Sequence, residues 1–352
     1  MGLVRVKIGK YEGSSLIVIS MLPVYVYKCL GNGMSKIGSS YWINFILLTL
    51  LAYVLISVLK KGIIFVRDSN NIFINYIFDG IYLVYIFSYG LYSLCLGTNV
   101  LYQITASYFS FEEVVYITLL VSFVCSSCGI EALSRTAYVV FGILAVMLLI
   151  MSLVSYKGWT FINFTPVLGN SVMGTFFDFS SAISLGGILT GLYVANYYKN
   201  GKLGYSIIKK SLVKFFVFSF IVTVLCIFCA PYPMITLYPF SLSAVLSVAK
   251  SGIFFHRFET ILVIFVSLIN VISTSFYIST ASSCICKLSG FNDAKPYSLV
   301  ISGLFYFCIM LSGLKKYLFF LYTISTILLI VMLFLFVITA CLKGRKNEIS
   351  EV

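Results

Sequence analysis

Ten separated apolar stretches divide the chain, and this pattern restricts the fold more than any other feature. A helix that crosses a bilayer needs about 20 mostly apolar residues. Hydrophobic residues make up 61% of the 352 residues and charged residues only 10%, whereas soluble domains are about one quarter charged. The sequence therefore predicts one all-α polytopic membrane domain over residues 1–352, with ten transmembrane helices near 14–31, 41–59, 72–97, 112–128, 137–155, 177–197, 212–231, 258–285, 297–314 and 317–342.

The distribution of Lys and Arg predicts how the chain is oriented. With a cytoplasmic N-terminus, 17 of the 24 Lys and Arg residues fall on the cytoplasmic side and 7 on the other side. Cytoplasmic loops of membrane proteins carry such an excess, so we expect both termini in the cytoplasm, with 343–352 as a cytoplasmic tail. The net charge of +13 is spread over short loops between apolar spans. It therefore indicates contacts with membrane lipid and no nucleic-acid partner.

Two of the ten spans are interrupted, and the two lie five spans apart. The first span contains Pro23, and the sixth contains the run 184–187, Ser-Leu-Gly-Gly. In a bilayer an unpartnered backbone group costs several kcal/mol, so a helix break persists only where it faces protein or a cavity. Matching breaks in two halves are typical of inverted-repeat transporters, which bind their solute at the breaks. We therefore predict repeats at about 11–156 and 174–342, with a small-molecule site between spans one and six.

The residues around the two breaks are the candidate ligand contacts. Glycines in span six let backbone amides face a ligand, and a half-helix N-terminus attracts an anion such as a carboxylate. The alternative for these glycines is close helix packing, because Gly187 and Gly191 have the small-x-x-x-small spacing. Spans three and eight are expected to close the pocket. The predicted ligand-binding set is Ser20, Pro23, Tyr25, Asp79, Ser184, Gly186, Gly187 and Thr274.

Asp79 is the only acidic residue well inside a span. An unpaired charge at that depth is costly, so Asp79 is expected either to titrate or pair within the bundle, or to lie in a water-filled vestibule. Thr274 belongs to the hydroxyl-rich run 273–275, Ser-Thr-Ser. Hydroxyls of this kind commonly bond to carbonyls of their own helix, which is the alternative to a ligand role.

Enzyme signatures are absent from the sequence. A single histidine, His256, excludes most catalytic schemes, and no Gly-rich nucleotide loop occurs. Most of the ten cysteines lie within spans, where Cys behaves as a small apolar residue. We therefore predict a protein that is not an enzyme and has neither a cofactor nor a metal site.

Three short motifs follow one another along the chain after the fourth span. Residues 129–137 read Gly-Ile-Glu-Ala-Leu-Ser-Arg-Thr-Ala, 238–240 read Tyr-Pro-Phe and 255–260 read Phe-His-Arg-Phe-Glu-Thr. Together with the length and the ten spans, this order resembles the spore germination permeases. These are the B subunits of endospore germinant receptors, a branch of the amino acid–polyamine–organocation superfamily. The resemblance covers nearly the whole chain.

The resemblance implies a LeuT-like core of five plus five spans in the spore inner membrane. It also implies a germinant receptor A subunit and a C-subunit lipoprotein as partners, and a small nutrient, commonly an amino acid, as the ligand. Glu131 and Arg135 are expected to pair or to contact a subunit, and Arg257 and Glu259 to anchor or gate span eight. An amino acid transporter of the same superfamily is the alternative function, and a membrane scaffold that binds no ligand is a third.

Overall fold

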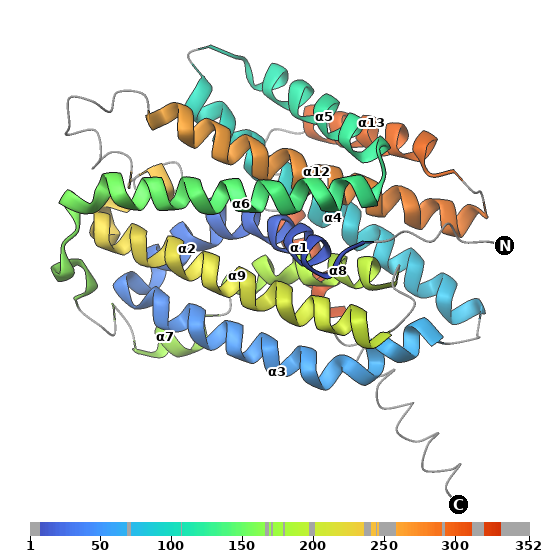
Figure 1. The fold of residues 1–352 in the computed structure, drawn as a ribbon, viewed down its shortest axis with the longest axis horizontal. Helices are drawn as coiled ribbons and strands as arrows, with labels where there is room; N and C mark the ends of the chain where they lie inside the picture. Colours follow the sequence, from blue (N-terminus) through green and yellow to red (C-terminus); the bar gives the residue numbers. More distant parts are fainter. Residues whose placement is uncertain are drawn as a thin grey trace, which may run out of the picture.

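The computed structural model describes a helical bundle whose long helices lie side by side (Figure 1). Every regular element in the described part of the chain is a helix. The described residues are 8–68, 72–106, 108–165, 169, 172–178, 180–196, 201–235, 241–243, 245, 258–290, 293–311 and 320–331.

The first predicted span is one helical path with a change of pitch. Helix α1 (Lys10–Val24) continues into a π-helix, η1 (Tyr25–Cys29), and then into α2 (Leu30–Ile37). Gly38 ends α2 with φ 78°, a conformation that favours glycine because it has no Cβ. A 3₁₀ turn, η2 (Gly38–Ser40), then leads into α3 (Tyr41–Asp68).

Spans three to five form the long helices α4 (Ile72–Thr105), α5 (Phe111–Ser127) and α6 (Ile130–Ser155). A capping box begins α5: Ser110 N–H donates to the Glu113 carboxylate at 2.8 Å, and Glu113 N–H donates to Ser110 Oγ at 3.4 Å. Gly129, with φ 89°, joins α5 to α6. Helix α6 therefore begins at Ile130, so the segment expected to be a loop up to residue 136 is helical.

The sixth span is divided, as the run at 184–187 predicts. A 3₁₀ segment, η5 (Ser180–Leu185), gives way to α8 (Gly186–Asn196) at Gly186. A short helix, α7 (Val172–Phe177), precedes it, and α9 (Gly201–Cys229), α12 (Phe258–Ser289) and α13 (Lys295–Leu311) follow. The connecting segments hold short helices: η3 (Tyr156–Gly158), η4 (Phe161–Phe164) and α10 (Tyr232–Ile235).

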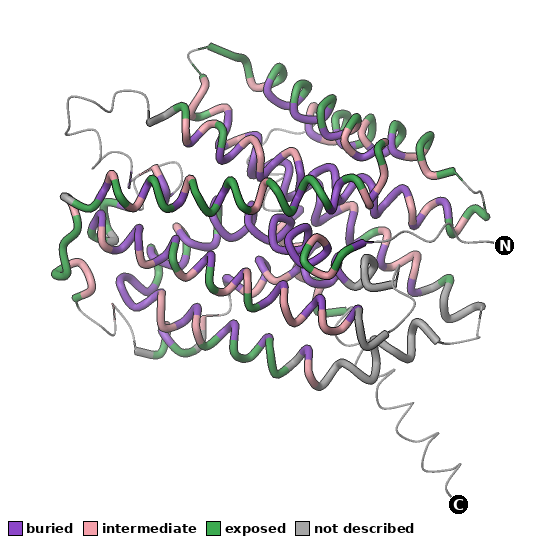
Figure 2. The backbone as a smooth tube through the Cα atoms, viewed as in Figure 1, coloured by how far each residue is buried: buried purple, intermediate pink, exposed green. Residues whose placement is uncertain are grey.

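Helix α1 lies at the centre, and every residue of it from Gly13 to Val24 is buried. The parts of the chain around α1 are mostly buried, whereas α5, α6 and α13 turn exposed residues outward (Figure 2). Many of those exposed residues are large and apolar, including Val139, Leu149 and Leu153 of α6. An outer surface of this kind suits contact with lipid.

Five stretches of the described helices are long and apolar enough to cross a membrane. The first, Lys10–Val54, contains the first span and part of α3, and two further helices, Lys295–Met310 and Phe320–Val331, are apolar but shorter. The chain is thus an all-helical, multi-pass membrane protein. The number of ten spans stays a prediction.

Candidate functional site

The candidate site lies where α1, the η5–α8 segment, α4 and α12 meet. We call this place the helix junction. Its members come from both interrupted spans and from the two helices that pack across them: Ser20, Met21, Tyr85, Tyr89, Ser184, Gly186, Gly187 and Tyr277.

The interruption of the first span is a π-turn and not an unwound segment. Pro23 has no N–H, so it cannot bond the carbonyl of Ile19. Shortly after Pro23 the backbone hydrogen bonds span five residues instead of four, as in the bond from Leu30 N–H to the Tyr25 carbonyl. The expected break therefore keeps the helix continuous and shifts its register. Single π-turns of this kind occur frequently at functional sites.

Ser20 reaches the junction through its backbone. Its hydroxyl donates to the carbonyl of Ile17 at 2.7 Å, within its own helix. Its carbonyl accepts a hydrogen bond of 2.6 Å from the Tyr277 hydroxyl. Tyr25, in contrast, turns to α9, where its hydroxyl shares a hydrogen bond with Thr223. Tyr25 thus stabilises the first span against α9, and its predicted ligand role is not supported by this geometry.

The glycines of the sixth span are closely packed. A Cβ at Gly187 would lie 2.6 Å from Met21 Cγ and 3.1 Å from the Met21 backbone N, and one at Gly191 would lie 2.6 Å from Ile17 Cδ1. The packing alternative therefore holds for Gly187 and Gly191, which let α8 approach α1. Ser184 bonds within its own segment, since its hydroxyl donates to the Ser181 carbonyl at 2.7 Å.

Gly186 differs because tyrosines of α4 face it. A Cβ there would meet the Tyr85 hydroxyl and would lie 2.6 Å from Cε2 of Tyr89. The absence of a side chain at Gly186 thus brings the first residue of α8 directly against two phenol rings. These rings stack with their centroids 5.7 Å apart, and Tyr89 also meets Tyr277 edge to face at 5.7 Å.

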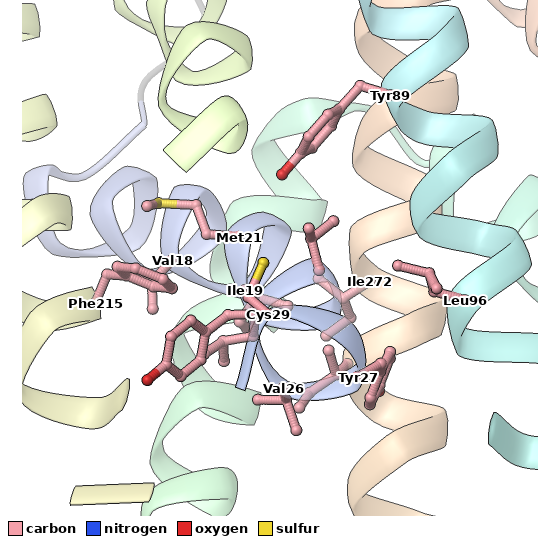
Figure 3. Packing of buried hydrophobic residues seen from close by; sticks show 14 of the residues in the cluster. Val18, Ile19, Met21, Val26, Tyr27, Cys29, Tyr89, Leu96, Phe215 and Ile272 are labelled. Carbon is pink, nitrogen blue, oxygen red and sulfur yellow. The ribbon is translucent and has the colours of Figure 1, made fainter. Parts of the chain in front are cut away.

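Tyrosines of α4 were not among the residues expected from the sequence. Tyr82 donates to the carbonyls of Leu189 and Thr190 at 2.8 and 2.9 Å, and Tyr89 donates to that of Ile183 at 3.1 Å. Figure 3 shows Tyr89 projecting from α4 toward the first span. The overlooked signal is the spacing of Tyr82, Tyr85, Tyr89 and Tyr92, which places four phenols on one helical face.

Tyr85 differs from Tyr82, Tyr89 and Tyr277 because its hydroxyl has no hydrogen-bond partner among the described residues. Its side chain is fully buried, and its oxygen forms no hydrogen bond in the described structure. A buried hydroxyl without a partner costs free energy. This donor points at the beginning of α8, where the helix dipole is positive. The Tyr85 hydroxyl and the beginning of α8 together can therefore hold an anionic group such as a carboxylate.

Thr274 lies in the seam between α4 and α12. Gly90 packs against Tyr277 and Gly97 against Asn270, so the two helices are antiparallel and Thr274 falls between these contacts. Its buried hydroxyl has no partner in the described structure, unlike the neighbouring Ser275, which donates to the Val271 carbonyl at 2.6 Å. The expected bond of Thr274 to its own helix is therefore not formed.

Asp79 lies outside the junction, in an ion pair between helices. The Lys287 ammonium on α12 lies 2.6 Å from the Asp79 carboxylate, and the Asp79 side chain is only 16% exposed. The carboxylate is thus neutralised by a neighbouring helix. This geometry does not support a direct ligand role for Asp79.

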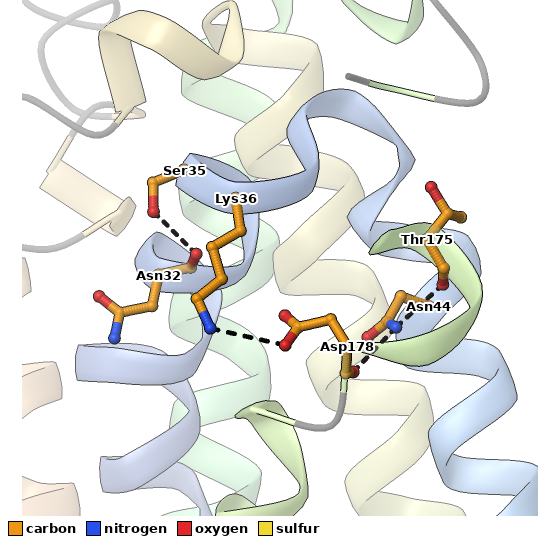
Figure 4. A network of polar contacts seen from close by, with 6 residues as sticks. All are labelled: Asn32, Ser35, Lys36, Asn44, Thr175 and Asp178. Atoms are coloured by element: carbon orange, nitrogen blue, oxygen red, sulfur yellow. Dashed lines mark hydrogen bonds and ion pairs between the residues drawn. The ribbon is translucent and has the colours of Figure 1, made fainter. Parts of the chain in front are cut away.

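A polar network fixes the segment that precedes η5. Lys36 of α2 lies 3.5 Å from the Asp178 carboxylate. Asn44 of α3 donates to the backbone carbonyls of Thr175 and Asp178 at 2.9 and 3.0 Å (Figure 4). The network ties the two interrupted spans together beyond the junction.

The remaining predicted residues lie elsewhere. Arg135 pairs with Glu131 at 2.6 Å in the first turns of α6. Arg257 lies outside the described residues, and Glu259 belongs to α12 without a described side chain. Among the described residues, no group of three His, Cys, Asp or Glu side chains is placed to hold a metal ion.

Comparison with solved structures shows the fold. A nucleobase-cation-symport-1 family transporter, in a closed conformation with bromovinylhydantoin bound, matches with a TM-score of 0.62 at 12% identity, over 90% of this chain and 75% of its own. The Eremococcus coleocola manganese transporter, in complex with an aromatic bis-isothiourea substituted compound, matches with a TM-score of 0.56 at 13% identity, over 94% of this chain and 78% of its own. The chain therefore resembles LeuT-fold transporters. No family model matches the chain, and no curated protein matches it.

Proposed function

We propose that this membrane protein binds a small solute bearing a carboxylate, most simply an amino acid, at the helix junction. The observation that carries the proposal is the buried Tyr85 hydroxyl, which has no partner among the described residues and lies against the beginning of α8. A carboxylate there accepts a hydrogen bond from the hydroxyl and meets the positive end of the helix. Because Tyr85 and Tyr89 now fill the space at Gly186, binding requires their rings to move.

Movement of the rings connects binding to the rest of the bundle. Tyr89 and Tyr82 hold the sixth span by hydrogen bonds to its carbonyls, so displacement of α4 side chains alters the contact of α4 with η5 and α8. A ligand shifts a conformational equilibrium by the difference in its affinity for the two states. The two interrupted spans then correspond to the first spans of two inverted repeats, about 11–156 and 174–342, with both termini in the cytoplasm.

Within this framework the protein is the nutrient-sensing B subunit of a spore germinant receptor in the spore inner membrane. The motifs at 129–137, 238–240 and 255–260 support this assignment. The A subunit and the C-subunit lipoprotein are the corresponding partners. The second candidate is an amino acid transporter, which the likeness to two transporters favours.

A binding experiment tests the proposal. Purified protein is titrated with the standard L-amino acids, and each ligand found is compared with its carboxamide counterpart. A hydrogen bond to a charged group contributes about 1.5–3 kcal/mol, so the carboxamide should bind at least about 10-fold more weakly. Equal affinity for acid and carboxamide would refute the carboxylate contact.

A transport experiment separates the two candidate functions. The protein is reconstituted into liposomes with the same labelled ligand. A sensor binds the ligand without accumulating it, whereas a transporter fills the liposomes at a rate that depends on the protein. Binding without uptake supports the receptor subunit, and uptake supports the transporter.

A further inference from the structure

Three lysines lie close together at one end of the apolar part of α9. Lys209, Lys210 and Lys214 fall within the stretch Gly204–Cys229, which is long and apolar enough to cross a membrane. All three residues are partly buried. A position at the edge of an apolar helix is where lysines reach toward lipid headgroups.

Aromatic rings surround these ammonium groups. Lys210 and Lys214 flank one ring, that of Tyr11, with Nζ at 4.3 and 5.6 Å from its centroid. Lys209 lies 4.4 Å from the centroid of the Tyr53 ring. Cation–π contacts of this kind hold an ammonium group in place without removing its charge. We call these five residues the basic–aromatic patch.

The charge of the patch has no counterion in the described structure. None of the three lysines has a carboxylate within ion-pair distance among the described residues, unlike Lys36 and Lys287, which are paired. Lys214 donates to a neutral oxygen, Ser15 Oγ, at 3.1 Å. Three positive charges thus lie within two turns of α9, two of them on the same Tyr11 ring, and remain available to an anion.

An exposed apolar surface adjoins the patch. On α9 the face that carries Lys209 continues through Val213 and Val217, which are 51% and 50% exposed. On α3 the neighbours of Tyr53 include Leu50 and Val54, which are 58% and 60% exposed. A soluble anion gains nothing from this surface, whereas the acyl chains of a lipid cover it.

We propose that the basic–aromatic patch binds the phosphate headgroup of an anionic phospholipid, with the acyl chains lying along α3 and α9. Charge complementarity selects the headgroup, and the adjoining apolar surface selects a lipid over a free phosphate. The site is separate from the helix junction and does not depend on the proposed ligand. It ties a lipid to α1, α3 and α9 at once.

The test counts lipids retained by purified protein. Wild type and the double variant K209Q/K210Q are loaded with phosphatidylglycerol or phosphatidylcholine, and bound lipid is measured by native mass spectrometry. Lys214 is kept because it bonds to α1. The matched control is K28Q/K295Q, which removes two exposed lysines elsewhere. The charge-retaining variant K209R/K210R reports whether these positions tolerate change.

A lysine near an anionic surface contributes about 1 kcal/mol, which is roughly 5-fold in affinity, so the double variant should bind phosphatidylglycerol roughly 25-fold more weakly. Binding by the control and by K209R/K210R should stay near that of wild type, and phosphatidylcholine should show no preference for the site. Equal retention of phosphatidylglycerol by K209Q/K210Q and wild type would overturn the proposal. If inorganic phosphate bound at the patch in the same measurement and phosphatidylglycerol did not, the choice of a lipid would be overturned.

Discussion

The hydroxyl of Tyr277 on α12 donates a hydrogen bond of 2.6 Å to the carbonyl of Ser20 on α1. Both residues are fully buried, and the bond reaches the first span just before Pro23. Through it, α12 supports α1 where proline interrupts the backbone ladder. The helix junction is therefore held by side chains as well as by its backbone.

Replacement of Tyr277 by phenylalanine should destabilise the protein. The change removes the donor and leaves the Ser20 carbonyl without it, at a cost of about 1 kcal/mol, as for other hydrogen bonds between membrane helices. Thermal unfolding in detergent measures the loss. Tyr92→Phe is the matched control, since the Tyr92 hydroxyl has no partner in the described structure. An equal loss in both variants would mean that the bond contributes nothing.

Replacement of Gly187 by alanine should also destabilise the fold, by about 1–3 kcal/mol as for other overpacked sites. The new Cβ would lie 3.1 Å from the backbone N of Met21, which cannot move without displacing α1. Gly142→Ala on α6 is the control, because no atom lies within 4 Å of a Cβ there. Alanine should stabilise that helix by up to about 1 kcal/mol. Similar unfolding temperatures for the two variants would contradict the close packing of α8 on α1.

The ion pair between Asp79 and Lys287 should contribute modestly. Lys287 is 55% exposed, and exposed pairs contribute about 0.2–1 kcal/mol. A double-mutant cycle with Asp79→Asn and Lys287→Gln should give a coupling energy in this range that falls as salt is added. Ligand affinity should be unchanged in Asp79→Asn. A large loss of affinity would return Asp79 to the binding site.

The sequence predicted the helical membrane class and the position of the division in the sixth span. Both features can be read from local sequence. A helix that crosses the lipid needs a long apolar stretch, and helices that approach closely need small residues at the contact. It did not predict that the first span would stay helical. Whether a proline opens a helix or shifts it into a π-turn depends on neighbours such as Tyr277, which are distant in the chain.

The candidate site could be predicted only in part. Ser20, Ser184, Gly186 and Gly187 do meet at the junction, whereas Tyr25 and Asp79 are engaged by α9 and α12. The ion pair of Asp79 is one of the outcomes expected from its depth, but the depth of a residue along a helix does not reveal which neighbouring helix its side chain faces. The phenols of α4 were overlooked because tyrosine is common throughout this chain, and only their spacing marks them.

The most direct test of the carboxylate site is replacement of Tyr85 by phenylalanine, with unfolding temperature and amino acid affinity measured on the same preparation. The variant should be as stable as wild type or more stable, because it loses a buried hydroxyl that has no partner in the described structure. Its affinity should fall by about 10-fold or more, since the lost hydrogen bond is made only to the ligand. Tyr82→Phe should show the opposite pattern, because its hydroxyl bonds to α8 and not to a ligand. Unchanged affinity in a stable Tyr85→Phe variant would contradict the account.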